Sequence, residues 1–151
     1  MLVGTGLAGR MGVGIGVDGM PNCYLLALCH SSSLDNSTNN WSLFNLIEQI
    51  KVREFPFQPP FESHAYWRFN PDEYEIDFEM RLILVSDHGL ATQSNPLPLR
   101  SNTARLRIRV TGAPPIERPG NYELRVEWRR QGTDSWTRCD SVWPLQVEQL
   151  Q

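Results

Sequence analysis

The sequence lacks the long apolar runs that cross membranes. No stretch of its 151 residues approaches the roughly 18 consecutive apolar residues of a membrane helix. A secretory signal is also missing, because Arg10 is followed by a glycine-rich stretch instead of an apolar core. We therefore expect a cytoplasmic protein with no membrane partner.

The sequence has no large excess of positive or negative charge, and it has few cysteines. The 14 basic and 17 acidic residues give a net charge of −3. Nucleic-acid-binding domains usually carry a basic excess, so no nucleic-acid partner is expected. The three cysteines, Cys23, Cys29 and Cys139, form an odd set, which argues against a disulfide framework. We predict that all three are buried free thiols.

Recognisable catalytic and metal-binding motifs are lacking. The glycines of residues 4–9 match a dinucleotide-binding pattern, but only three residues precede them, and the glycine-rich sequence that follows is too poor in helix formers to begin the required helix. Cys23 with Cys29-His30 lacks the paired spacing of zinc ligands. Ser31-Ser32-Ser33 lacks the context of a nucleophile and is predicted as a polar turn. The sequence therefore predicts no catalytic residues, no cofactor and no metal ligands.

The sequence does contain alternation of apolar and polar residues with a period of two, which is typical of half-buried β-strands. The strands predicted in this way are 63–69, 74–85, 104–110, 122–129 and, briefly, 145–147. Residues 23–30 form a mostly apolar run that suits a buried strand. Proline, glycine and Asx turn signals separate them at intervals of roughly 8–12 residues, which is typical of a sandwich or a barrel. We predict an all-β fold, an antiparallel β-sandwich that is immunoglobulin-like in the broad sense, with about seven or eight strands.

Residues 41–52 fit two kinds of structure. One apolar set has helical spacing, and another alternates as in a strand that Glu48 interrupts. The preceding Asn39-Asn40 serves equally well as a helix N-cap or as a hairpin turn. Periodicity alone leaves both alternatives open.

The first residues differ in composition from the rest. Residues 1–19 hold seven of the 11 glycines, and glycine loses the most conformational entropy on ordering. We predict a flexible glycine-rich leader at 1–19 and a single sandwich domain at 20–151. The sequence leaves open whether Met1 or Met20 is the true start.

Several landmarks, in this order, resemble a known family. They are the stretch 42–50, Phe55-Pro56, the stretch 78–89, the stretch 118–124 and a closing strand around Pro144 to Val147. From about residue 23 to 148, the chain resembles a group of small bacterial β-sandwich proteins catalogued only as a domain of unknown function. The resemblance implies a sandwich, a strand at 42–50 and no assigned catalytic residues. The leader and the long 91–103 segment depart from the family's pattern.

Charged residues form rows on the outward faces of the predicted strands. One row is acidic (Glu75, Asp77, Glu79), one is basic (Arg105, Arg107, Arg109), and one, at 123–129, is mixed. If these strands are neighbours, opposite charges pair across the sheet, which is the interpretation we favour. Otherwise the arginine row is an anion-binding or partner site.

Tryptophans add to this candidate surface. Trp67 and Trp128 fall on inward sets and are predicted as core. Trp136 follows a turn, and aromatic residues are enriched at interfaces. The candidate partner surface is therefore Arg105, Arg107, Arg109, Trp136 and Trp143.

The leading hypothesis is a non-catalytic cytoplasmic binding or accessory module whose partner is another protein. The alternative is a metal-dependent or hydrolytic enzyme with a site in the inter-strand loops.

Overall fold

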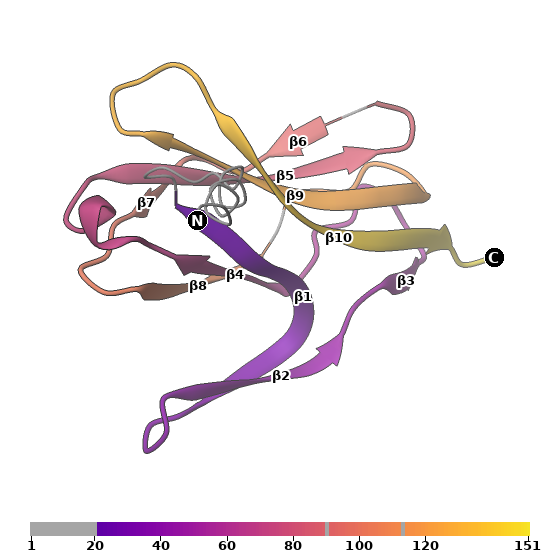
Figure 1. The fold of residues 1–151 in the computed structure, drawn as a ribbon. Helices are drawn as coiled ribbons and strands as arrows, with labels where there is room; N and C mark the ends of the chain where they lie inside the picture. The colour runs from indigo at the N-terminus through magenta and orange to yellow at the C-terminus, as the bar shows by residue number, and fades with distance from the viewer. Residues whose placement is uncertain (1–20, 90, 113) are drawn as a thin grey trace, which may run out of the picture.

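A computed structural model describes residues 21–89, 91–112 and 114–151 of the chain (Figure 1). This part of the chain holds ten β-strands, one 3-10 turn and no α-helix, so the prediction of an all-β fold is confirmed. None of the described segments is a helix that could span a membrane. The predicted leader, its glycine pattern and the choice between Met1 and Met20 lie outside the described residues.

The strands form two sheets. In order across the first sheet lie β2 (Asn40–Leu46), β1 (Asn22–Asp35), β4 (Glu62–Arg68) and β8 (Arg105–Thr111). Across the second lie β3 (Gln49–Val52), β10 (Thr137–Gln149), β9 (Gly120–Arg130), β5 (Phe78–Ser86) and β6 (Ala91–Gln93), while β7 (Leu97–Leu99) pairs with another part of β5. Every pair is antiparallel except β3 with β10.

One core lies between the two sheets. Trp67 on β4 and Val126 on β9 are both fully shielded from solvent. Phe78 and Trp128 join this core, and their rings meet edge to face with centroids 5.5 Å apart. The predicted inward positions of these four residues are confirmed, because period-two alternation gives each strand one apolar face that must be buried.

The chain crosses from one sheet to the other within residues 41–52. β2 pairs with β1, whereas β3 pairs with β10. Ile47 lies at the crossing, where its N–H donates to the carbonyl oxygen of Leu28 at 2.9 Å. Asn39, with a φ of +58°, closes the β1–β2 hairpin by donating its N–H to the carbonyl oxygen of Asp35. The strand and hairpin alternatives are therefore confirmed, and the helical alternative is wrong.

Several predicted boundaries were wrong. β5 begins at Phe78 instead of residue 74, because the 3-10 turn Pro71–Glu73 and the left-handed Glu75 (φ +64°) bend the chain first. Residues 31–33 continue β1 and form no turn. β10 is far longer than the predicted closing strand, and 91–103 contributes two short strands. These two, together with the division of 41–52, bring the count above the predicted seven or eight.

Candidate functional site

The structure brings together three of the five residues of the candidate partner surface. Arg105, Arg107 and Arg109 share the outer face of β8, which is the last strand of the first sheet (Figure 1). Trp136 lies elsewhere, over the outer face of the second sheet. Its ring covers the guanidinium groups of Arg81 and Arg129 at 4.2 and 4.3 Å.

Trp143 also has a role within the fold. It is half-buried against the core, and its Nε1 donates to the carbonyl oxygen of Ile47 at 2.7 Å. This hydrogen bond joins β10 to the point where the chain crosses between the sheets. Neither tryptophan therefore extends the surface formed by the arginines of β8.

The pairing expected between the acidic and basic rows is wrong. The arginine row lies in the first sheet, whereas Glu79 lies on β5 in the second sheet and accepts a hydrogen bond from Arg129 at 2.7 Å. The mixed row of β9 does meet β5 as expected, since Arg81 also donates to Glu127. The alternation along a strand shows which residues share a face. It does not show which strands are neighbours, because that depends on the packing of all the strands in the sheet.

The register of β8 shows which of its backbone groups point outward. The N–H of Phe69 donates to the carbonyl oxygen of Ala104, and the N–H of Gly112 donates to that of Phe61. In an antiparallel pair, residues bonded to the partner strand alternate with residues whose N–H and C=O groups point away from it. The even-numbered residues from 104 to 112 therefore bond toward β4. Arg107 and Arg109 point their backbone groups away from it.

No described strand pairs with that outward edge of β8. The carbonyl oxygen of Arg105 accepts a hydrogen bond from the Thr103 hydroxyl at 3.0 Å. Within the described part of the chain, the outward backbone groups of Arg107 and Arg109 have no partner. β8 therefore presents an open sheet edge beside a row of positive charge.

The fold leaves most of this charge without a carboxylate. Arg107 donates through Nη1 to the carbonyl oxygen of Asn39 at 2.7 Å. Arg109 lies 3.9 Å from the Glu62 carboxylate and is 46% exposed. The guanidinium of Arg105 has no partner among the described residues. Glu62 is thus the one described carboxylate within 4.0 Å of the row.

Two of the hollows that adjoin β8 are lined in part by its arginine row. One of about 770 Å³ lies between the hairpin tip and the outer face of the sheet, and its lining includes Tyr24, Trp41, Tyr66, Arg105 and Arg107. The other, of about 510 Å³, lies between β7 and β8, and its lining includes Leu97, Leu106, Ile108 and Val110. One face of β8 thus offers cations and aromatic rings, and the other offers an apolar groove.

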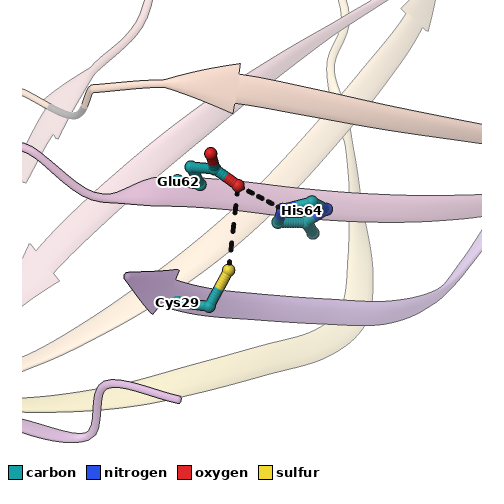
Figure 2. Close-up of side chains that lie close together, drawn as sticks. All are labelled: Cys29, Glu62 and His64. Carbon is teal, nitrogen blue, oxygen red and sulfur yellow. Dashed lines mark hydrogen bonds and ion pairs between the residues drawn. The ribbon is translucent and has the colours of Figure 1, made fainter. Parts of the chain in front are cut away.

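A second constellation lies on β1 and β4. Cys29 and Glu62 are cross-strand partners, and His64 follows Glu62 by two residues, so all three share the outer face of the sheet (Figure 2). Cys29 and His64 are fully buried, and the Glu62 side chain is 17% exposed. Their ligand atoms lie within 4.8 Å of one another.

Glu62 is the centre of this cluster. Its Oε1 is 3.1 Å from His64 Nε2, accepts a hydrogen bond from the Ser32 hydroxyl at 2.5 Å, and lies 4.0 Å from the Cys29 sulfur. The hydrogen bond from Ser32, aided by His64 and Arg109 against the opposing effect of burial, lowers the pKa of Glu62. Burial, and next the Glu62 charge, raise the pKa of the Cys29 thiol. The cluster therefore favours a carboxylate beside a protonated thiol.

Two polar atoms near this cluster are buried without a hydrogen-bond partner, Nδ1 of His64 and the hydroxyl oxygen of Tyr66. The Trp41 ring packs edge-on against His64 with centroids 5.5 Å apart. Since Trp41 and Tyr66 also line the larger hollow, the cluster lies next to it. A buried polar atom without a partner is costly, so its position needs a reason other than packing.

Sequence reasoning missed this cluster. It considered Cys29 together with Cys23 and His30, but His30 is exposed, and the Cys23 thiol donates to the carbonyl oxygen of Leu25. The shared parity of Glu62 and His64 was a visible signal. The 33-residue separation between Cys29 and Glu62 was not bridged by any sequence pattern. The predicted burial of all three cysteines as free thiols is confirmed.

Comparisons with known proteins assign no function. No family model matches the chain. No curated protein matches it. One solved structure with a resembling arrangement is a family 123 glycoside hydrolase from Clostridium perfringens, with a TM-score of 0.37 and 11% sequence identity over 83% of this chain. The match covers 28% of the hydrolase chain, and at this TM-score it supports no inference about function.

Proposed function

We propose that this chain is a non-catalytic binding module that takes up an extended, acidic segment of a partner protein as an added strand beside β8. The proposal depends on one observation. Among the described residues, the outward N–H and C=O groups of Arg107 and Arg109 have no hydrogen-bond partner, and Glu62 is the one carboxylate within 4.0 Å of the arginine row. The proposal includes a cytoplasmic location, where thiols such as the three free cysteines stay reduced.

Strand addition uses both properties of the edge. Main-chain hydrogen bonds to the open edge supply affinity, and alternate side chains supply specificity. Cross-strand neighbours lie about 4.5–5.5 Å apart, so alternate residues of the incoming segment would meet the arginine row. Carboxylates suit that side. The remaining residues would face the groove lined by Leu106 and Ile108, where apolar side chains suit.

Charged edge strands also protect proteins against edge-to-edge aggregation. The arginine row both protects this edge and selects its partner. It repels basic strands and a second copy of the same edge, and it attracts acidic strands. The predicted ligand is therefore a segment in which acidic and apolar residues alternate.

The test uses a fluorescent peptide of roughly eight residues, which is within the usual range of strand lengths, in which glutamate and valine alternate. Fluorescence anisotropy should show saturable binding that weakens as salt screens the charges. Arg107→Glu should weaken binding about tenfold or more, equal to about 1.4 kcal/mol. Arg53→Glu, which makes the same change of charge at an exposed position after β3, is the matched control and should leave binding unchanged.

Two further peptides separate strand addition from simple charge attraction. A lysine–valine peptide should not bind. A glutamate–valine peptide with N-methyl groups on alternate amides keeps its charge but loses the donors of one edge, and it should bind at least tenfold more weakly. Equal binding of the methylated peptide would show that no strand is added, and equal binding by the Arg107→Glu variant would show that the surface lies elsewhere.

The resemblance to the group of small bacterial β-sandwich proteins stays a prediction, and it is consistent with this proposal. That group carries no established activity, so the resemblance adds no catalytic role. The proposal rests on β8 alone and would hold for the same edge in any sandwich.

A further inference from the structure

We infer that Cys29, Glu62 and His64 form a zinc-binding site on the outer face of the first sheet (Figure 2). A thiolate, an imidazole and a carboxylate are the three donor types that proteins offer to Zn²⁺. The sulfur and nitrogen donors favour Zn²⁺ over Mg²⁺ and Ca²⁺, which take oxygen ligands. The inference is independent of strand addition at β8.

The spacing of the donors suits a tetrahedral ion. With zinc bonds of about 2.0–2.3 Å, ligand atoms at tetrahedral angles lie roughly 3.3–3.5 Å apart. The 3.1 Å from Glu62 Oε1 to His64 Nε2 and the 4.0 Å from Glu62 Oε1 to the Cys29 sulfur bracket these values. These two distances differ from the tetrahedral values by no more than about half an ångström. The Cys29 sulfur lies within 4.8 Å of a ring nitrogen of His64, so the donors surround one position for an ion.

Charge balance favours Zn²⁺ at this buried position. The ion carries two positive charges, and the Cys29 thiolate and the Glu62 carboxylate carry one negative charge each, so the loaded site is neutral. Burying a neutral group avoids most of the cost of burying separate charges. On binding, the Cys29 thiol releases its proton to solvent. His64 coordinates through Nε2 as a neutral imidazole, the form that binds zinc, with its proton on Nδ1.

The surroundings hold the donors in place. The paired backbones of β1 and β4 fix Cys29 opposite Glu62. Ser32 donates to the Glu62 carboxylate, and Arg109 lies 3.9 Å from its second oxygen, as outer partners of a metal ligand do. Three protein donors leave a fourth coordination position for water.

The test loads the untagged, chelator-treated chain with Co²⁺ as a spectroscopic substitute for zinc. One equivalent should produce a thiolate-to-cobalt charge-transfer band in the near ultraviolet, and Zn²⁺ should displace it. Cys29→Ser should abolish the band. Cys139→Ser, which alters another buried cysteine, is the matched control and should retain it. Glu62→Gln should weaken Co²⁺ binding at least tenfold and keeps the Cys29 thiol.

Thermal unfolding supplies a second measurement. Zinc at about one hundred times its Kd should raise the Tm of the wild-type chain by roughly 5–10 °C and leave that of Glu62→Gln much less changed. If Cys29→Ser does not fold, the Glu62→Gln titration decides. Absence of the band in the folded wild-type chain, its persistence in Cys29→Ser, or an equal rise in Tm for Glu62→Gln would each overturn the inference.

Discussion

His64 and Glu62, two positions apart on β4, meet at 3.1 Å on the outer face of a sheet whose other face forms the core. His64 is nevertheless fully buried there, because the Trp41 and Tyr66 rings pack against it. This part of the sheet is thus shielded on both sides. A polar cluster in such a place is held by specific hydrogen bonds, and its titration should affect the stability of the fold.

The lowered pKa of Glu62 predicts a loss of stability in acid. A carboxyl group whose pKa is lower in the folded state stabilises the protein above its unfolded pKa, here near 4.5, and this contribution is lost as pH falls through the folded pKa. The difference in Tm between wild type and Glu62→Gln should therefore be largest near neutral pH and should shrink below about pH 4.5.

Thermal melts between pH 3 and 7, followed by circular dichroism, would measure this difference. The exposed Glu54→Gln variant is the control and should track the wild type across the range. If the difference in Tm between wild type and Glu62→Gln is the same at every pH, the pKa of Glu62 is not lowered by folding.

Phe78 should be among the costly positions of the core. Its side chain is 5% exposed and packs against Trp128 and Phe69. Phe78→Ala should lower the free energy of unfolding by about 3–5 kcal/mol, through lost burial and a residual cavity. Glu79→Ala removes a partly exposed ion pair with Arg129 and should cost about 1 kcal/mol or less. Urea denaturation measures both, and a larger loss for Glu79→Ala would mean that the faces of β5 are reversed.

Trp136 is expected to act within the fold. Its ring lies over Arg81 and Arg129, and each cation–π contact contributes about 0.5–1 kcal/mol at an exposed site. Trp136→Ala should therefore lower the free energy of unfolding by about 1–2 kcal/mol. It should leave binding of the glutamate–valine peptide unchanged. If Trp136→Ala instead weakens peptide binding and leaves the free energy of unfolding unchanged, Trp136 belongs to the partner surface.

Cys23 and Cys139 should be unreactive in the native protein. Burial, as the largest cause, raises the pKa of Cys23 to about 12 and that of Cys139 to about 11. Because the thiolate is the reactive form, almost none is present at pH 8. Ellman's reagent at pH 8 should therefore modify both thiols slowly in native protein and rapidly in guanidinium chloride. Fast native reaction in a Cys29→Ser background would show that one of the two is accessible.

Much of the local structure could be predicted from the residues alone. Alternation located the strands at 63–69, 104–110 and 122–129 to within one or two residues, because a half-buried strand needs one apolar face over its whole length. The same parity correctly placed Arg105, Arg107 and Arg109 on one face. The alternation predicted a strand wrongly at 74–77. These residues follow the buried Glu73 at the end of the 3-10 turn, and Glu75 among them has a left-handed backbone.

The choice of strand partners was decided by the tertiary structure. Parity is a property of neighbouring residues, whereas the order of a sheet depends on how all the apolar faces are covered at once. The arginines of β8 therefore lie beside β4 and an open edge. Of the acidic residues expected opposite them, Glu79 lies in the other sheet, and Glu75 and Asp77 lie before β5, where they pair with Arg100. For the same reason Cys29 meets Glu62 only through the register of β1 with β4, since their 33-residue separation leaves no periodic trace in the sequence.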